Sequence, residues 1–186
     1  METADFIEKL KAGDRAAFHE LVAIHGKQVL NTCHRLLLDR QDAEDVSQEV
    51  FIEVFQSIKT FRNEAKLSTW IYRIAVTRSL DELKKQKRKK RITSLGKLLH
   101  LDEAAHWLAG GTMADTSLHE EERMKEIRQA LNSLPDNQRV AFALSKIDGY
   151  TNQEIAEIMK TTTIAVESLV HRAKKKLSDE LKKNLK

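Results

Sequence analysis

Apolar residues recur at spacings of three and four along most of the chain, and strand-like alternation of apolar and polar residues is absent. This period matches the 3.6 residues per turn of an α-helix, so the sequence predicts an all-α protein. The only proline, Pro135, falls between two such segments. The predicted helices cover approximately residues 3–11, 14–37, 42–58, 68–88, 119–133, 136–147, 151–159 and 163–182.

Three local signals mark where helices begin. Asp14 and Ser68 each precede a periodic apolar segment, and both residue types cap helices because their side-chain oxygens accept backbone N–H groups. Thr151 and Glu154, three residues apart, form a capping-box pattern. We therefore expect helix N-termini at these positions.

The helical pattern stops between residues 89 and 118, where Gly96, Gly110 and Gly111 lie among small polar residues. Such a segment is typical of a linker, with one short helix near residues 98–108. The chain is therefore predicted to hold two small helical domains, at residues 1–88 and 119–186, joined by a linker at 89–118. Its 186 residues are enough for a modest core in each domain.

Charge alternates in blocks along the chain. The net charge is +4, but residues 1–56 sum to −5, residues 57–97 to +10, residues 98–157 to −6 and residues 158–186 to +5. Basic blocks favour contact with nucleic acid, and acidic surfaces favour basic protein partners. A chain with both is suited to bridge the two, and its opposite charges also suggest a closed form of the free protein.

The first acidic block is concentrated in DAEDVSQEVFIEVF, residues 42–55. On a helical wheel its apolar residues fill one half, and its acids crowd the other half together with Ile52. The helix dipole accounts for acids in the first turn but not for Glu49 and Glu53, and like charges four residues apart cost about 0.2–0.5 kcal/mol per pair. This face is either a solvated surface or a docking face for a basic partner.

The first basic block, FRNEAKLSTWIYRIAVTRSLDELKKQKRKKR, begins as a loop and continues as a helix. Trp70, Arg73, Thr77, Lys84 and Arg88 share one stripe of that helix. An aromatic ring beside cations can stack on unpaired bases while the cations contact phosphates, as single-stranded nucleic acid requires. The alternative is that the tryptophan belongs to the core and the cations are solvated at the helix C-terminus.

The second basic block is preceded and partly formed by TNQEIAEIMKTTTIAVESLVHRAKKKL, residues 151–177, which fits two helices joined by a turn at residues 160–162. Such a helix-turn-helix projects its second helix into the major groove of DNA. The outer face of that helix carries Glu167, Ser168, His171 and Arg172, followed by lysines suited to phosphates. An ordinary helical hairpin with a basic tail is the alternative.

Motifs of enzymes and metalloproteins are missing. The sequence has no Gly-rich phosphate loop, no H-E-x-x-H motif and no cysteine pair, so we expect no catalytic residue, cofactor or metal site. His100, His106 and His119, in or beside the linker, complete no metal-binding spacing. No apolar run reaches the ~18–20 residues of a membrane span, and the single Cys33 fits a reducing compartment. The sequence therefore predicts a cytoplasmic protein without membrane insertion.

Over about residues 5–180, the order and spacing of these segments resemble a bacterial RNA polymerase sigma factor of the extracytoplasmic-function (ECF) group. DAEDVSQEVFIEVF is similar to the polymerase-docking helix of that family. The segment from residue 61 to residue 91 is similar to the part that melts and reads the −10 promoter element. LNSLPDNQRVAFALSKIDGYTNQEIAEIMKTTTIAVESLVHRAKKKL resembles the domain that reads the −35 element.

The resemblance implies a sigma region 2-like bundle and a region 4-like helix-turn-helix domain. It implies a non-enzymatic subunit that binds core RNA polymerase, at the beta-prime coiled coil and the beta flap. This subunit would direct polymerase to promoter DNA, contacted as duplex and as melted single strand, under the control of an anti-sigma factor. The rival reading is a helix-turn-helix regulator that binds duplex DNA as a homodimer, which leaves the acidic helix and the stripe of Trp70 without a purpose.

The resemblance also implies roles for residues. Those expected to face polymerase are Asp42, Asp45, Gln48 and Glu49. Those expected at the −10 element are Phe61, Arg62, Lys66, Trp70, Arg73, Thr77, Arg78, Lys84 and Arg88, and the loop at residues 61–67 would border a pocket for a flipped base. Those expected at the −35 element are Thr151, Thr162, Thr163, Glu167, Ser168, His171, Arg172 and Lys175.

The chain departs from the family pattern at three of its positions. Thr77 stands where many members have asparagine, so a −10 base preference does not transfer. Glu167 and Leu169 stand where a lysine and an arginine are common, which makes Ser168, His171 and Arg172 the stronger −35 candidates.

Overall fold

The computed structural model describes residues 4–98 and 129–184, and every element in this part of the chain is helical. The N-terminal elements are α1 (Ala4–Lys11), α2 (Arg15–Leu37), α3 (Arg40–Ser57), the short 3-10 helix η1 (Ile58–Thr60) and α4 (Leu67–Leu98). The C-terminal elements are α6 (Asp136–Lys146), α7 (Asn152–Met159) and α8 (Thr163–Asn184), and residues 129–133 are also helical. The predicted all-α class is confirmed for the described residues.

Some predictions fall outside the described residues. They are the short helix near residues 98–108, the first part of the helix at 119–133, and the three histidines at positions 100, 106 and 119.

The predicted helix starts are confirmed at two positions. The Asp14 carboxylate accepts from the backbone N–H groups of Ala16 and Ala17, at 2.7 and 3.2 Å. The Thr151 hydroxyl accepts from the Glu154 backbone at 3.2 Å, and the Glu154 carboxylate accepts from the Thr151 backbone at 3.1 Å, which completes the capping box. The predicted cap at residue 68 was wrong, because α4 begins at Leu67 and this serine lies inside its first turn.

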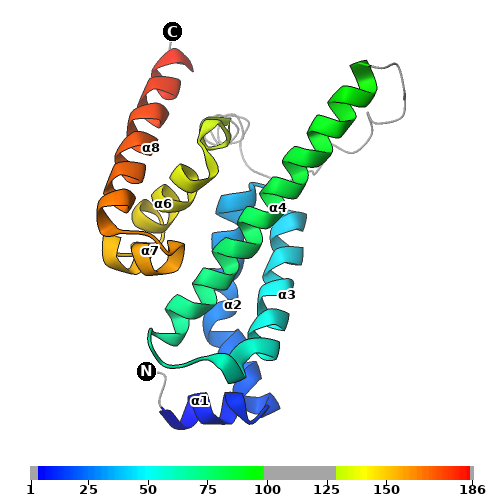
Figure 1. The fold of residues 1–186 in the computed structure, drawn as a ribbon, viewed down its shortest axis with the longest axis vertical. Coiled ribbons are helices and arrows are strands. Elements are labelled where there is room, and N and C mark those ends of the chain that lie inside the picture. The colour runs from blue at the N-terminus through cyan, green and yellow to red at the C-terminus, as the bar shows by residue number, and fades with distance from the viewer. Residues whose placement is uncertain (1–3, 99–128, 185–186) are drawn as a thin grey trace, which may run out of the picture.

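Helix α4 is longer than predicted. It was expected to end at residue 88 but continues to Leu98, and its C-terminal part extends beyond α2 and α3 (Figure 1). Lysine and arginine are good helix formers, and no glycine interrupts the basic run before Gly96. A dense block of like charge therefore did not end the helix.

The N-terminal domain is a bundle of α2, α3 and α4, with α1 lying across one end (Figure 1). Each long helix turns a fully buried apolar stripe toward the others, because its apolar residues recur at helical spacing. Side chains of this core include Leu21, Val29 and Leu36 of α2, Val50 and Val54 of α3, and Ile71 and Ala75 of α4. Phe6 and Leu10 of α1 complete it.

The C-terminal domain packs α6, α7 and α8 around Val140, Leu144, Ile155 and Val166. Lys160 directly follows α7 as its C-cap, and its φ of 51° is left-handed, a conformation that glycine adopts at lower cost. The predicted turn at residues 160–162 and the helix that follows it are confirmed.

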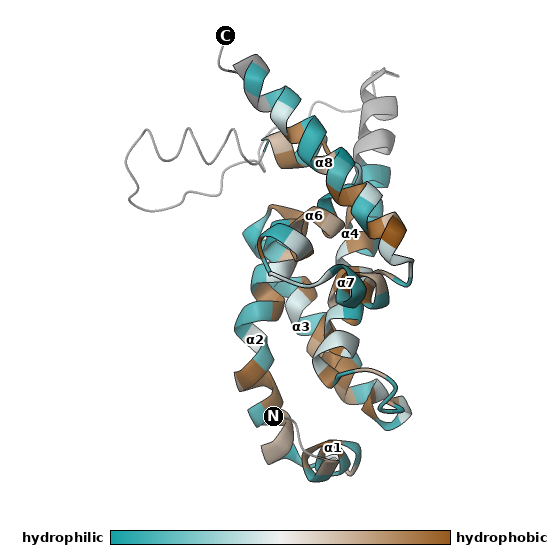
Figure 2. Cartoon of the chain, turned by 90° about the vertical axis from the view of Figure 1, so that its left-hand side faces the viewer, coloured by the Kyte–Doolittle hydropathy of each residue, from teal (hydrophilic) through white to brown (hydrophobic). Residues whose placement is uncertain are grey.

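The two domains are in direct contact. Helix α7 packs against α4, and α6 packs against α2, as the view of Figure 2 also shows. Parts of the basic surface of α4 therefore face the C-terminal domain rather than solvent.

Candidate polymerase and nucleic-acid surfaces

Helix α3 presents its acids on the side opposite its buried stripe. Asp45, Gln48 and Glu49 are exposed, and the neighbouring Ile52 is 56% exposed. We call these four residues the α3 face. Their exposure follows from the helical wheel, because the bundle covers the other side of α3.

The other acids of α3 already have partners. Asp42 is partly buried and accepts from the side-chain amide of Gln86 on α4 at 2.7 Å. Burial, followed by the nearby carboxylate of Asp39, raises the pKa of Asp42. Glu53 forms an ion pair with Arg78 of α4 at 2.5 Å. Of the four residues predicted to face polymerase, Asp45, Gln48 and Glu49 therefore lie together on the exposed side of α3, and the partly buried Asp42 lies at the edge of this group.

The position of Trp70 is compatible with both interpretations that the sequence left open, a core residue and a ring that stacks on unpaired bases. It is half-buried against the core, and its ring centroid lies 5.3 Å from that of Phe61. Phe61 itself is only 5% exposed, so its ring packs against the tryptophan and is not accessible from solvent.

The predicted −10 cations lie along α4 and the loop before it. Arg62 and Arg88 are exposed, as is Thr77, whose hydroxyl donates to the Arg73 carbonyl at 2.8 Å. Lys84 pairs with Asp81 at 3.0 Å.

Two further −10 candidates contact the C-terminal domain. Lys66 pairs with Glu154 at 3.2 Å, and the Arg73 guanidinium donates to the Glu157 carbonyl at 3.1 and 2.8 Å. The structure thus brings the stripe together on one side of α4 but covers part of it.

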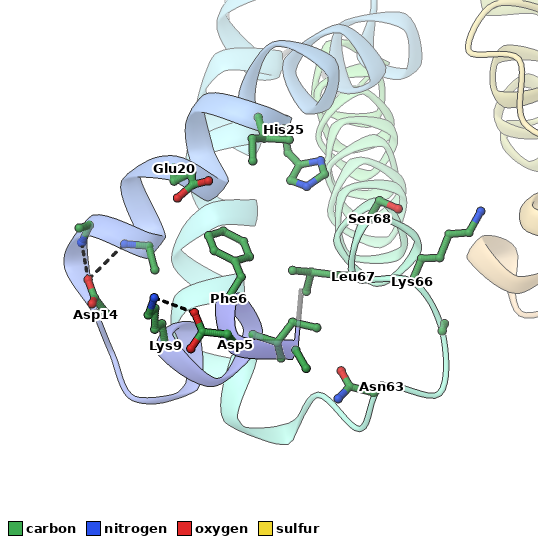
Figure 3. A pocket seen from close by; sticks show the side chains of 16 residues that line it. Asp5, Phe6, Lys9, Asp14, Glu20, His25, Asn63, Lys66, Leu67 and Ser68 are labelled. Atoms are coloured by element: carbon green, nitrogen blue, oxygen red, sulfur yellow. Dashed lines mark hydrogen bonds and ion pairs between the residues drawn. The ribbon is translucent and has the colours of Figure 1, made fainter. Parts of the chain in front are cut away.

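A cavity of about 1100 Å³ lies between α1, the first half of α2 and residues 63–68 (Figure 3). Its lining includes Phe6, His25, Asn63, Lys66 and Leu67, and the side chain of Lys66 extends outward from it. Small-molecule sites span about 300–1,000 Å³, so this space is large enough for a nucleobase. The predicted loop therefore does border a pocket.

The outer face of α8 carries the predicted −35 residues Thr163, Glu167, His171, Arg172 and Lys175 exposed, and Ser168 partly so. Two contacts order this face. The Arg172 guanidinium donates to the Ser168 hydroxyl at 2.6 and 3.2 Å, and the Asn152 amide donates to the Glu167 carboxylate at 3.3 Å.

Two of the three threonines of the −35 set cap helices. Thr151 caps α7, and the hydroxyl of Thr162 accepts from the Ala165 backbone at 3.2 Å at the start of α8. Both are exposed, so they can meet DNA while their hydroxyl groups serve the turn.

The residues that join the two domains were missed by the sequence analysis. Asp148, in the turn between α6 and α7, pairs with Arg35 of α2 and accepts from the Thr32 hydroxyl at 3.4 Å. The Tyr150 ring lies 5.4 Å from that of Tyr72 on α4. The only local signal is the turn IDGY, which predicts a bend and says nothing about what the bend contacts.

Within the described residues, no helix combines the length and the apolar character that crossing a membrane requires.

Comparisons with known proteins agree with this arrangement. The model of Sigma-70 region 2 matches residues 21–89, and that of Sigma-70 region 4 matches residues 124–177. The ECF RNA polymerase sigma factor SigW of Bacillus subtilis is 30% identical over 177 residues, covering 95% of each chain.

Two solved structures share the fold. CnrH, in complex with the cytosolic domain of CnrY, aligns with a TM-score of 0.68 at 20% identity over 95% of each chain. The sigma factor RpoE of Bartonella quintana, in complex with the anti-sigma factor NepR, aligns with a TM-score of 0.63 at 22% identity, over 89% of this chain and 96% of that one.

Proposed function

This chain belongs to the ECF group of RNA polymerase sigma factors, which bind core RNA polymerase and direct transcription initiation at promoters, and on that premise we propose how its surfaces divide the work. The observation that carries the proposal is that the chain has three separate surfaces with different chemistry: the α3 face, the outer face of α8, and the stripe on α4 that holds Trp70, Arg73, Thr77, Lys84 and Arg88. An acidic face suits a protein partner, and the other two suit DNA.

Polymerase is bound through Asp42, Asp45, Gln48 and Glu49, which face the beta-prime coiled coil. The C-terminal domain meets the beta flap. Exposed carboxylates on a rigid helix favour one orientation of a basic partner and increase its rate of association.

The melted −10 strand runs along α4. Trp70, supported by Phe61, stacks on a base, while Arg62, Lys66, Arg73, Arg78, Lys84 and Arg88 contact phosphates beside Thr77. The cavity beside residues 63–68 receives an unstacked base.

The −35 duplex is read by α8. The side chains of Glu167, Ser168, His171 and Arg172 face base edges, and Thr151, Thr162, Thr163 and Lys175 contact the backbone.

The protein acts in the cytoplasm, has no catalytic activity of its own, and is held inactive by an anti-sigma factor. The RpoE neighbour is solved in complex with such a factor, which supports this last point. The domain limits at residues 88 and 118 stay a prediction, since α4 crosses the first of them.

The test is transcription in vitro with purified core enzyme on a library of promoter fragments. We expect initiation at a defined subset of fragments, with a shared −10 and −35 pattern. Initiation no higher than with core enzyme alone, by protein shown to be helical by circular dichroism, would contradict the proposal.

A further inference from the structure

One apolar side chain at the start of α8 is exposed to an unusual extent. Ile164, in the first turn of this helix, is 77% exposed, more than any other large apolar side chain in the part of the chain that the structure describes. Single exposed apolar residues are common on protein surfaces, so exposure alone assigns no role. The position of Ile164 on α8, in contrast, indicates one.

Ile164 lies on the side of α8 that points away from the core of the C-terminal domain. The buried stripe of this helix consists of Val166, Val170 and Ala173. At about 100° per residue, the opposite side holds Ile164, Ser168, His171 and Lys175, spaced by four, three and four residues. Ile164 is therefore the N-terminal member of the line that also carries predicted −35 residues, and it is the apolar one.

Local folding gives no reason for isoleucine at this position. The first turn of a helix favours acidic side chains, and isoleucine is a weaker helix former than alanine because its side chain is β-branched. The Thr162 hydroxyl already caps the turn by accepting from the Ala165 backbone at 3.2 Å, and Val166 supplies the fully buried contact. Neither the cap nor the core requires an apolar side chain at residue 164.

The major groove of DNA offers one partner that suits this side chain. The N-terminal residues of a recognition helix contact base edges, and the only methyl group that the bases present there is the C5-methyl of thymine. Isoleucine packed on the polar edge of another base would leave a donor or acceptor without a partner, which costs free energy. Contact with thymine buries a methyl group instead. The β-branched side chain also has few rotamers, so it loses little entropy on contact.

We propose that Ile164 determines specificity at the −35 element, where its side chain packs on the C5-methyl group of one thymine. The inference rests on the proposed function of α8 and adds an apolar contact to the polar contacts assigned to this helix. Arg172 lies eight residues further along α8, about 12 Å along the helix axis. Base pairs follow one another every ~3.4 Å, so Ile164 and Arg172 contact different base pairs.

The first experiment selects −35 sequences from a promoter library with core polymerase and the full-length chain. We expect the wild type to prefer thymine at one −35 position and Ile164→Ala to reduce this preference about fourfold, with the other positions unchanged. Fourfold corresponds to ~0.8 kcal/mol, the contribution of one buried methyl-sized group. Ile164→Val should retain most of the preference, because valine keeps a branched apolar side chain. Arg172→Ala should alter a different position.

The matched control is Ile147→Ala. Ile147 follows α6 directly and is 47% exposed, so this variant makes the same substitution at an exposed isoleucine of the same domain but outside α8. It should select the same −35 sequences as the wild type. Far-ultraviolet circular dichroism should show equal helical content in all variants, since both isoleucines are at the surface.

The second experiment removes the methyl group from the DNA. Deoxyuridine pairs as thymidine does but lacks the C5-methyl group. At the preferred position, this replacement should weaken promoter binding by the wild-type holoenzyme about fourfold and leave binding with Ile164→Ala unchanged. At the other thymines of the −35 element, the effect of deoxyuridine should be the same for the two proteins.

A uniform loss with Ile164→Ala on all promoters overturns the inference, because it places the side chain against the sugar-phosphate backbone. Deoxyuridine effects that are equal for the wild type and Ile164→Ala at every thymine overturn it as well. Failure of the proposed function is seen separately, when the wild-type holoenzyme selects no −35 sequence at all. That result overturns both the proposed role of α8 and the thymine contact.

Discussion

At the scale of single residues, Glu49 is the acid that local structure accounts for least. Asp42 lies in the first turn of α3 and accepts from Gln86, whereas Glu49 is exposed and, within the described residues, takes part in no hydrogen bond or ion pair. Substituting Asp45→Lys together with Glu49→Lys should weaken binding to core polymerase by about tenfold, because complementary charges become like charges. A competition assay with labelled core enzyme measures the change.

The matched control for this pair is Glu44→Lys. Glu44 lies on another side of the same helix, where it already pairs with Arg40 at 2.8 Å. Far-ultraviolet circular dichroism should show equal helical content in all variants, since the substituted side chains are at the surface. Equal affinity of the double variant and the control would refute the docking role.

Arg172 carries a prediction about sequence readout. Its guanidinium is held by Ser168 on the outer face of α8, an orientation suited to a base edge, and a bidentate arginine contact discriminates between bases by about 1–3 kcal/mol. Arg172→Ala should therefore change which −35 sequences are selected from a promoter library. Lys175→Ala should weaken all sequences about equally, as loss of a phosphate contact does. A uniform loss for Arg172→Ala would make it a phosphate contact too.

Residue positions were predictable where the signal is local. The caps at Asp14 and Thr151 follow from a side chain and the backbone within three residues of it, so the sequence contains the whole interaction. Phe61 was expected at the DNA surface but is buried under Trp70, because burial depends on what the bundle places over a residue.

At the scale of elements, α7 depends on an ionised cap. Hydrogen bonds from the Thr151 backbone and hydroxyl, and then from Lys66, lower the pKa of Glu154 below its ordinary value. A lowered pKa means that the ionised form favours folding, so this stabilisation is complete above the ordinary value of 4.5 and is lost as pH falls through the folded-state value. The stability of α7 should thus fall with acidification.

Glu154→Gln tests this, because glutamine keeps a capping oxygen but does not titrate. Between pH 7 and about pH 3.5, the melting temperature of the wild type should drop by roughly 2–4 °C more than that of the variant, as expected for about 1 kcal/mol. Glu157→Gln, an exposed position on the same helix, is the control. Parallel pH profiles for wild type and Glu154→Gln would show that the cap does not depend on charge.

The helices themselves were largely predictable, and their limits were less so. Period 3.6 placed α2, α3, α7 and α8 close to their observed bounds, since one buried face imposes that period. The predicted end of α4 was ten residues too early, because the dense basic run was interpreted as the start of a linker. Lysine and arginine are good helix formers, so the helix continues through this run.

At the scale of the whole molecule, the blocks of opposite charge suggested a closed form as a hypothesis only, and in the structure the two halves are in contact. It could not predict Asp148 or Tyr150 as the centre of that contact. Both follow α6 in a turn, and their importance comes from Arg35 and Tyr72, more than seventy residues earlier in the chain. Contacts of this separation leave no periodicity in the sequence.

Closure and initiation should therefore exclude each other, which a reversible crosslink can test. Lys87→Cys with Asp136→Cys places thiols at an exposed pair of residues that joins the domains. A disulfide-containing bismaleimide then fixes the closed form. Cys33 does not compete, because it is buried and desolvation raises the pKa of its thiol to about 11, so little thiolate forms at neutral pH.

The crosslinked chain should bind core polymerase, since the α3 face stays exposed, but should not initiate at promoters that the wild type uses. Reductive cleavage of the linker should restore initiation in the same sample. Glu8→Cys with Lys11→Cys, crosslinked within α1, controls for the reagent, because that pair lies inside one helix. Full initiation by the crosslinked chain would mean that the two domains need not separate to reach promoter positions −10 and −35, which lie 25 nucleotides, or about 85 Å of B-DNA, apart.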